Sequence, residues 1–335
     1  MKLYGIDFGG TNLRIGAVDP KTGEIIGDVF ARDISNITTN EELTDIINSQ
    51  ITDSSQTGIS AAGDVDEDRL VIKKSPNSRI RGEITFGKTL KEKGHPVSLT
   101  NDMKAAVQAA AKYGEGKGFE NVLLATYSSG YNCAVVRKGI NASQAEFGHF
   151  RYKDNGDLFC GCGEKAHLEI YISGNGAAAM AKQFFLTTKI TDHPILQYAL
   201  EDYNKEAEKT YKKSDLSDPE IHAKIVCSVS SKHVYQAFAS DPEMEPQKSI
   251  QKSQAGAVAA SFGMMNSAFN PLDIMVLMGS QTKDWDILFK PAIELYHNEG
   301  LQLSTLRKPS IVRTGLPEIG VQGAAAYFLV QSVYT

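Results

Sequence analysis

A carboxylate, two glycines and a hydroxyl group follow one another near the start of the chain, in the segment Asp7-Phe8-Gly9-Gly10-Thr11-Asn12. Glycine adopts positive φ without strain, so such a turn can direct backbone N–H groups at a phosphate while the aspartate holds the accompanying metal ion. A Gly-Gly pair is also common in tight hairpin turns that bind nothing. The turn alone therefore leaves a phosphate site and a purely structural role both open.

Asn101 and Asp102 form a second candidate site, directly after the short apolar segment Val97-Ser98-Leu99-Thr100. Polar residues at strand ends commonly form the binding site of α/β proteins. A carboxylate there can accept the proton of a hydroxyl group while that hydroxyl attacks a phosphorus atom. The same pair is also a good helix N-terminus, and the catalytic and capping roles are compatible.

These candidates need strands that end at them. Apolar residues over 3–8 predict a strand that runs into the Gly-Gly turn, residues 13–18 predict its hairpin partner, and residues 24–30 predict a third antiparallel strand. The pattern then predicts, in order, an amphipathic helix over 40–53 capped by Thr39 or Asn40, strands over 57–63 and 97–100, and a helix over 104–113.

The second half repeats this order. The breaker run Gly114-Glu115-Gly116-Lys117-Gly118 predicts a domain boundary, after which residues 121–125 and 133–136 predict another hairpin. We therefore expect a duplicated architecture without a visible residue-level repeat. The polar stretch 188–254 predicts solvated helices and loops with a charged face. A helix over 255–269, a buried strand over 273–278 and a closing helix over 321–330 complete the chain.

Composition limits the function. A length of 335 residues predicts two domains, and 41% hydrophobic with 22% charged residues is typical of a folded globular protein. The net charge of -5 argues against nucleic-acid and anionic-membrane partners and favours a small molecule. We expect a cytoplasmic protein, because the chain has neither a signal-like start nor an apolar run that could span a bilayer. Four cysteines in such a chain do not predict a disulfide scaffold.

Further motifs follow the two candidate sites in order: Glu146-Phe147-Gly148-His149, Cys160-Gly161-Cys162-Gly163, Leu168-Glu169-Ile170-Tyr171, Ser173-Gly174 and Leu277-Met278-Gly279-Ser280. The series resembles the ROK family of sugar kinases and sugar-responsive repressors, within the actin-like ATPase superfamily. The resemblance covers nearly the whole chain except the polar stretch, and it is most specific over 146–169.

The resemblance implies an α/β, two-domain actin-like ATPase (ribonuclease H-like) fold, with mixed sheets flanked by helices and an interdomain cleft for sugar and nucleotide. Residues 1–115 would form the N-terminal domain, completed by the closing helix 321–335, and residues 116–320 the C-terminal domain. Members are commonly homodimers, so we expect one here.

The resemblance also assigns roles. Asp102 becomes the catalytic base, and Asp7 positions the magnesium ion of Mg-ATP. The expected sugar contacts are Asn77, Asn101, Asp102, Glu146, His149 and Glu169. The expected phosphate and nucleotide contacts are Gly9, Gly10, Thr11, Asn12, Ser128, Ser129, Gly130, Gly279 and Ser280. Carboxylates and amides suit a polyol, because each can bind two adjacent hydroxyl groups.

Family members usually carry structural zinc on one histidine and three cysteines at His149, Cys160, Cys162 and a fourth position. Here His167 stands in that fourth place. Histidine also ligates zinc, and two thiolates with two neutral imidazoles leave the site formally neutral. We therefore expect the zinc to be retained. Cys133 and Cys227 have apolar neighbours and are expected to be core residues.

The chain departs from the family at the second phosphate loop, which reads Thr126-Tyr127-Ser128-Ser129-Gly130-Tyr131-Asn132 where kinases are richer in glycine. Ser128 and Ser129 offer hydroxyl groups, but Tyr131 and Asn132 are expected to bring bulk where the backbone should approach a nucleotide closely. Either the donor binds differently or phosphoryl transfer is weakened.

The leading hypothesis is an ATP- and magnesium-dependent hexose kinase, with glucose as the first substrate to test. Kinases of N-acetylmannosamine, N-acetylglucosamine or fructose are alternatives, as is a sugar-binding or sensor protein without catalysis. Direct DNA regulation is not expected, because family repressors carry a helix-turn-helix before the Asp7 strand and this sequence has six residues there.

Overall fold

Two five-stranded sheets form the framework of the chain. The structure is a computed structural model that describes residues 2–52, 54–76, 78–128, 130–153, 156–299 and 305–334. The first sheet has the spatial order β3 (Ile25–Asp33), β2 (Asn12–Val18), β1 (Leu3–Phe8), β4 (Gln56–Ala61) and β7 (Val97–Asn101). The second has the order β10 (Ile140–Ala145), β9 (Tyr131–Arg137), β8 (Asn121–Tyr127), β11 (Ile274–Met278) and β12 (Ser310–Arg313).

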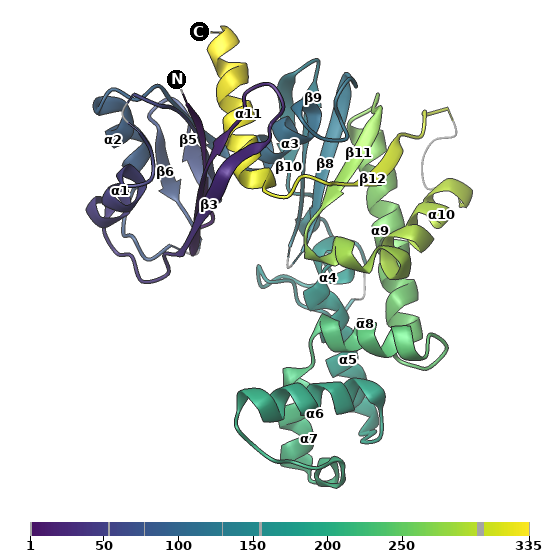
Figure 1. Cartoon of the computed structure of the whole chain (residues 1–335). Helices are drawn as coiled ribbons and strands as arrows, with labels where there is room; N and C mark the ends of the chain where they lie inside the picture. Colours follow the sequence, from purple (N-terminus) through teal and green to yellow (C-terminus); the bar gives the residue numbers. More distant parts are fainter. Residues whose placement is uncertain are drawn as a thin grey trace.

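The two sheets share one topology. In each, three consecutive strands pair antiparallel and two later strands extend the sheet in parallel from the first of the three. The predicted duplication of architecture is therefore confirmed. Figure 1 places the first sheet at the left and the second at the upper right, with the N-terminal half of the chain in the first.

Helices flank both sheets. With the first sheet belong α1 (Asn40–Asn48), α2 (Phe86–Glu92) and the small hairpin of β5 (Asp64–Asp66) and β6 (Val71–Lys74). The side chain of Thr39 caps α1, which ends before the expected residue 53. Two further helices, α3 (Asp102–Lys112) and α11 (Ile319–Tyr334), lie between the sheets and pack against each other (Figure 1).

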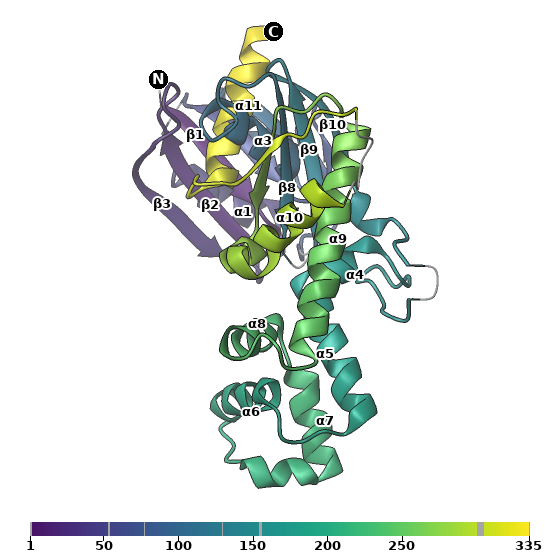
Figure 2. The ribbon, with the colours of Figure 1, turned by 90° about the vertical axis from the view of Figure 1, so that its right-hand side faces the viewer.

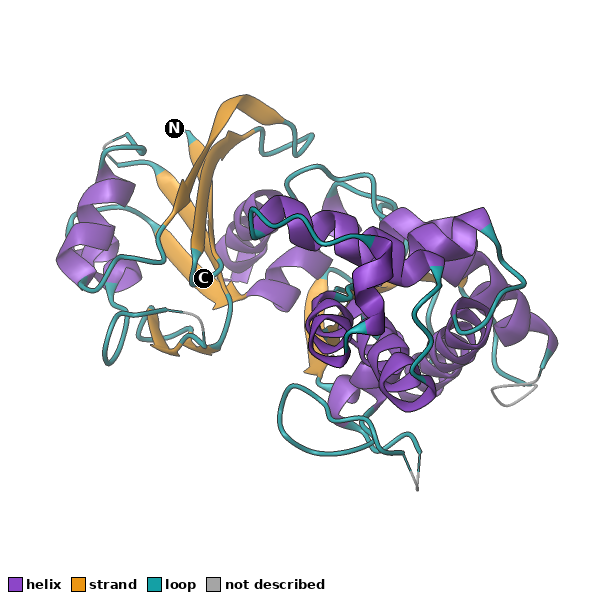
Figure 3. Cartoon of the chain, turned by 90° about the horizontal axis from the view of Figure 1, so that it is seen from below, coloured by secondary structure: helices purple, strands orange, loops and turns teal. Residues whose placement is uncertain are grey.

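The rest of the second half is mostly helical. Its helical elements are η1 (Phe147–His149), α4 (Leu168–Ile172), α5 (Gly174–Thr188), α6 (Pro194–Glu206), η2 (Lys213–Ser217), α7 (Pro219–Ser228), α8 (Ser231–Ser240), α9 (Gln247–Ala268), η3 (Ser280–Asp284), η4 (Trp285–Phe289) and α10 (Lys290–Asn298). Figure 2 shows α9 running from the second sheet toward the group α5 to α8. Figure 3 shows most helices to one side of the first sheet.

The polar stretch 188–254 contains the expected helices, but they do more than present a charged face. Residues of α5, α6, α7 and α8 enclose a hydrophobic cluster that includes Phe185, Leu196, Ile225 and Val234. The sequence pattern did not indicate this cluster, because each short helix contributes only a few apolar residues. Among the described helices, none is long and apolar enough to cross a bilayer.

Helix α11 packs closely against the first sheet and against α3, and glycines make this close packing possible. A Cβ at Gly58 of β4 would lie 1.9 Å from the Ala324 carbonyl oxygen, and a Cβ at Gly323 of α11 would lie 2.5 Å from the Ala105 carbonyl oxygen of α3. No real Cβ tolerates such distances, so backbone lies against backbone at these crossings. Gly58 and Gly323 therefore allow α11 to lie directly against β4 and α3.

We expect Gly58→Ala to lower the free energy of unfolding by about 3 kcal/mol, because the added methyl group must push α11 away from β4. Gly256→Ala in α9 is the matched control, since a Cβ there meets no atom within 4 Å. That control should be neutral or stabilising by about 0.5–1 kcal/mol. Thermal and urea unfolding would measure both. Equal stability of the two variants would contradict the backbone contact.

Candidate active site

Asp7 and Asn101 lie at the same edge of the first sheet. Asp7 is close to the end of β1 and Asn101 ends β7, and both strands run parallel to β4, which lies between them. Ser60 of β4 is the register partner of Asp7, and its hydroxyl donates to Asp7 Oδ1 at 3.1 Å. The two candidate sites that the sequence located at strand ends are thus brought together by β4.

The Asp7 carboxylate is half-buried in an acidic environment. Burial raises its pKa to about 6, and the nearby Asp102 carboxylate acts in the same direction. Arg14, its register partner on β2, acts in the opposite direction and also donates to Glu318 at 2.6 Å. A cation placed beside Asp7 would relieve this cost of ionisation.

Gly320, at the N-terminus of α11, lies directly against Asp7. A Cβ there would be 2.3 Å from Asp7 Oδ2. Position 320 was not among the site residues expected from the sequence. A glycine is therefore needed at position 320 to let the helix N-terminus approach the carboxylate, whose charge the N-terminal end of a helix stabilises.

Asp102 is the first residue of α3, and Asn101 is its N-cap. The Met103 N–H donates to Asn101 Oδ1 and to Asp102 Oδ1, at 2.9 Å each. The capping geometry expected from the sequence is therefore present. Burial raises the pKa of Asp102, and the carboxylate of Glu146 adds to that rise. Asp102 is thus near enough to interact electrostatically with Asp7 and with Glu146, although Glu146 follows β10 of the second sheet.

Asn132 holds Glu146 in place. Its Nδ2 donates to Glu146 Oε1 at 2.6 Å, and its Oδ1 accepts from the Cys133 N–H at 2.7 Å. The neighbouring Tyr131 is buried, with its ring centroid 5.0 Å from that of Tyr127. The expectation that Tyr131 adds bulk to the nucleotide side is therefore wrong, because alternation along β9 turns its ring into the core.

The second phosphate loop is held from several sides. Ser129 and the predicted sugar contact Asn77 lie outside the described residues. The Ser128 carbonyl oxygen accepts from Gln281 Nε2 at 3.2 Å and from the Gly174 N–H at 3.3 Å. A Cβ at Gly279, where φ is +106°, would lie 2.2 Å from the Tyr127 carbonyl oxygen. Gly279 and Ser280 therefore lie beside this loop.

Glu169 connects this loop to a cluster of cysteines and histidines. Its Oε2 accepts from the Tyr131 N–H at 3.1 Å, and its Oε1 accepts from the Cys160 thiol at 3.3 Å. Without a metal ion, burial raises the pKa of the Cys160 thiol to about 12. A bound zinc ion would favour the thiolate instead. The predicted sugar contact is therefore also a link between two other predicted sites.

The four predicted metal ligands converge. The candidate ligand atoms of His149, Cys160, Cys162 and His167 lie within 4.8 Å of one another. Cys162 Sγ is 3.2 Å from His167 Nδ1, and Cys160 Sγ is 3.7 Å from His149 Nδ1. Two sulfur and two nitrogen donors at this spacing fit a tetrahedral zinc ion. Of the other two cysteines Cys133 is buried as expected, but Cys227 is exposed and its assignment to the core is wrong.

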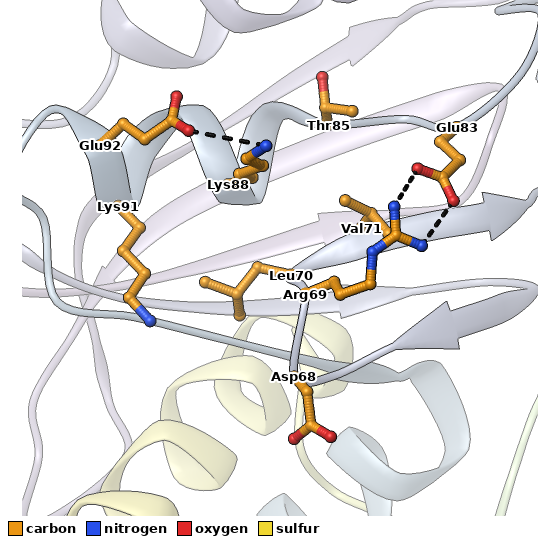
Figure 4. Close-up of a pocket in the computed structure, with 9 residues that line it drawn as sticks. All are labelled: Asp68, Arg69, Leu70, Val71, Glu83, Thr85, Lys88, Lys91 and Glu92. Carbon is orange, nitrogen blue, oxygen red and sulfur yellow. Dashed lines mark hydrogen bonds and ion pairs between the residues drawn. The ribbon is translucent and has the colours of Figure 1, made fainter.

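A pocket of about 410 Å³ lies beside Ser280 and Gln281, between α8 and η3. The Tyr235 hydroxyl of α8 lies within hydrogen-bond distance of Gln254 Oε1 (2.9 Å) and of Gln281 Oε1 (3.1 Å), and its single proton can be donated to either oxygen. Sequence reasoning missed the α8 side of this pocket, because that helix lies in the polar stretch and carries no motif. A second pocket, of about 400 Å³, is formed by the β5–β6 turn and α2 (Figure 4). It contains none of the predicted site residues.

Two sheets of one topology, with a Gly-Gly turn after the first strand and carboxylates gathered between the sheets, define a two-domain protein of the actin-like ATPase fold. The ROK family model matches residues 3–328, and the chain belongs to the ROK family. The family and fold expected from the sequence are therefore confirmed.

Several relatives are glucokinases. The glucokinase of Streptomyces coelicolor is 34% identical over 197 residues, which is 53% of this chain and 58% of that enzyme. The chain thus spans little more than half the length of that relative. The glucokinase of Thermotoga maritima is 26% identical over 306 residues, covering 88% of this chain and 86% of that enzyme.

The fold matches a solved ROK family glucokinase from Streptomyces griseus, in complex with glucose and AMPPNP. The TM-score is 0.69 at 24% identity, with 98% of this chain and 99% of that chain covered. A ROK family transcriptional regulator aligns with a TM-score of 0.71 at 16% identity, over 99% of this chain and 78% of the regulator. The fold therefore accommodates both kinases and regulators.

Proposed function

We propose that this protein is an ATP-dependent sugar kinase, with glucose as its first candidate substrate. The observation that carries the proposal is the gathering of Asp7, Asp102 and Glu146 between the sheets, where burial and mutual repulsion raise the pKa values of Asp7 and Asp102. A metal-directing carboxylate opposite a general base is needed for phosphoryl transfer and has no use in a pure sugar binder.

In the proposed reaction, Asp102 accepts the proton of a sugar hydroxyl as that oxygen attacks the γ-phosphorus of ATP. The hydroxyl must be held in line with the transferred phosphoryl group, and Asn101, Glu146, His149 and Glu169 are the candidate groups for holding the sugar. The raised pKa makes Asp102 a stronger base than an exposed aspartate. Bound Mg²⁺ would neutralise phosphate charge next to Asp7.

The nucleotide is proposed to extend from the Gly9–Asn12 turn past Ser128 and Gly130 to Gly279 and Ser280. The turn is closed by the Gly9 N–H, which donates to the Asn12 carbonyl oxygen at 2.9 Å. The 410 Å³ pocket beside Ser280 is large enough for a nucleobase. Residues 1–115 with the closing helix, and residues 116–320, are proposed as the two domains that close on the substrates and exclude water.

His149, Cys160, Cys162 and His167 are proposed to hold zinc, which would fix the segment 146–169 as a structural ion. Because Glu169 contacts both Cys160 and the Tyr131 N–H, that segment also supports the second phosphate loop. The alternative substrate N-acetylmannosamine is supported by a Listeria monocytogenes protein, a candidate N-acetylmannosamine kinase, that aligns with a TM-score of 0.68 at 18% identity.

The test is to incubate the purified protein with Mg-ATP and, separately, with glucose, fructose, N-acetylmannosamine and N-acetylglucosamine, while ADP is followed by a coupled assay. We expect sugar-dependent ADP release, greatest with glucose. Sugar binding without ADP release from any of the four would instead support the sensor alternative.

A further inference from the structure

We infer that Glu67, in the turn between β5 and β6, is a positioning residue that holds the Asn101–Asp102 segment in its catalytic geometry. This inference rests on the proposed kinase function and deepens it. Glu67 stands in the charged run Asp66-Glu67-Asp68-Arg69, which by sequence alone is typical of a solvated turn. In the structure it is half-buried and turned toward the first sheet.

Both oxygens of the Glu67 carboxylate are used. Oε1 accepts from the Thr100 hydroxyl at 2.8 Å and from Lys104 Nζ at 3.0 Å. Thr100 directly precedes Asn101 and is fully buried, and Lys104 lies two residues after Asp102 in the first turn of α3. One carboxylate therefore binds the residue before Asn101 and a residue that follows Asp102, and so restrains the Asn101–Asp102 segment from both sides.

The other oxygen connects the same residue to the closing helix. Oε2 accepts from the Tyr327 hydroxyl of α11 at 2.7 Å. The N-terminus of that helix lies against Asp7. Glu67 thus connects the β5–β6 hairpin to the start of α3 and to α11. Helix α3 carries Asp102, and α11 contacts Asp7.

Glu67 is ionised in this network. Burial raises its pKa, but the hydrogen bonds from Tyr327, Thr100 and Lys104 outweigh burial, so the net pKa lies below the ordinary value. A charge-assisted contact of this kind is stronger and better directed than a neutral one. The carboxylate also forms an ion pair with the Lys104 ammonium group at 3.0 Å.

The outer side of the same turn offers a matched control. Arg69 pairs with Glu83 through two contacts of 2.8 and 2.7 Å (Figure 4), and neither side chain reaches the Asn101–Asp102 segment. Glu83→Gln therefore loosens the turn from outside without removing a contact to β7, α3 or α11. A merely structural role of the turn would make Glu67 and Glu83 variants behave alike.

The first test does not depend on kinase activity. In Glu67→Ala, hydrogen exchange of the Met103 amide, which donates to Asn101 and Asp102, should be faster by about tenfold. Exchange in β8 and β9 should be unchanged, and Glu83→Gln should resemble the unmodified protein throughout. Unchanged exchange at Met103 would overturn the inference, whether or not the protein phosphorylates sugars.

The second test is kinetic. Because a misplacement of about 1 Å can cost about 10²-fold, Glu67→Ala should lower kcat/KM for the sugar by about that factor while KM for ATP stays unchanged. Glu67→Gln, which keeps one acceptor oxygen, should recover most of the loss. Combined with Asp102→Asn, Glu67→Ala should cause little further loss, since both act through one group. Fully additive losses would contradict the inference.

Thr100→Val removes one hydroxyl from the network and keeps the shape of the buried side chain, so it replaces Glu67→Ala if that variant does not fold. We expect the same direction of change in exchange and kinetics, about tenfold in kcat/KM for the sugar. If Thr100→Val and the unmodified protein gave the same exchange and the same kinetics, the inference that Glu67 positions Asn101 and Asp102 would be contradicted. Absence of ADP release from the unmodified protein would defeat the proposed function only.

Discussion

Asp102→Asn should lower sugar-dependent ADP release by about 10²- to 10⁴-fold, the usual contribution of a general base. The variant keeps the size of the side chain and an oxygen that can accept from the Met103 N–H, so the start of α3 should remain intact. What it removes is the ability to accept a proton from the sugar hydroxyl. The measurement is kcat with the best sugar of the panel.

Nucleotide binding and thermal stability serve as controls for Asp102→Asn. Both should be close to those of the unmodified protein, since Asp102 contributes to the cap but is assigned no contact with ATP. A variant that turns over at the unmodified rate would show that another group accepts the proton. A variant that loses nucleotide binding as well would show that Asp102 is needed for structure and not for proton transfer alone.

The pH profile of kcat/KM for the sugar gives an independent view of the same group, because it reports the ionisation of the free enzyme. Asp102 must be ionised to act as a base, and its pKa is raised by burial. The pKa of Asp7 is raised to about 6. Activity should therefore fall as the pH decreases through about 6 and be retained above it. In Asp102→Asn, the residual activity should no longer depend on the ionisation of residue 102, whereas the dependence that comes from Asp7 should remain.

Loss of the proposed zinc ion should also have a large effect, on both stability and sugar binding. We expect about one zinc per chain in protein purified without chelator, and none in Cys162→Ser, because a structural zinc site needs all four ligands. Since folding of such a site and binding of its metal are coupled, loss of zinc should lower the melting temperature and disorder the segment 146–169. Glu146 and Glu169 lie in this segment, so KM for the sugar should rise. Elemental analysis, thermal unfolding and kinetics would measure the three effects.

Cys227→Ser is the matched control for the metal prediction, because Cys227 is exposed and lies outside the four-residue cluster. It should keep zinc, stability and activity. Unmodified protein without zinc would remove the proposed metal site, and zinc retained in Cys162→Ser would show that Cys162 is not a ligand.

Much of the candidate site could be predicted from the sequence because its signals are local. Asp7 lies near the end of a strand and Asp102 directly follows one. Both carboxylates can be recognised from the hydrophobic pattern of the strand and from the turn or helix cap that comes next. The resemblance to the ROK family implied a metal site at His149, Cys160, Cys162 and His167, and the structure brings these four residues together. Strand-turn-strand order in each half likewise predicted two sheets of one topology.

Tertiary structure alone decided which side chains of these segments face the site. Tyr131 and Asn132 are adjacent, yet the pleat of β9 sends the tyrosine ring into the core and leaves the asparagine to hold Glu146. Glu67 has the neighbours of a solvated turn, and only the folding of the hairpin onto β7 and α11 gives it Thr100 and Tyr327. Such contacts join residues far apart in the chain, so neither the local hydrophobic pattern nor a helix-capping motif predicts them.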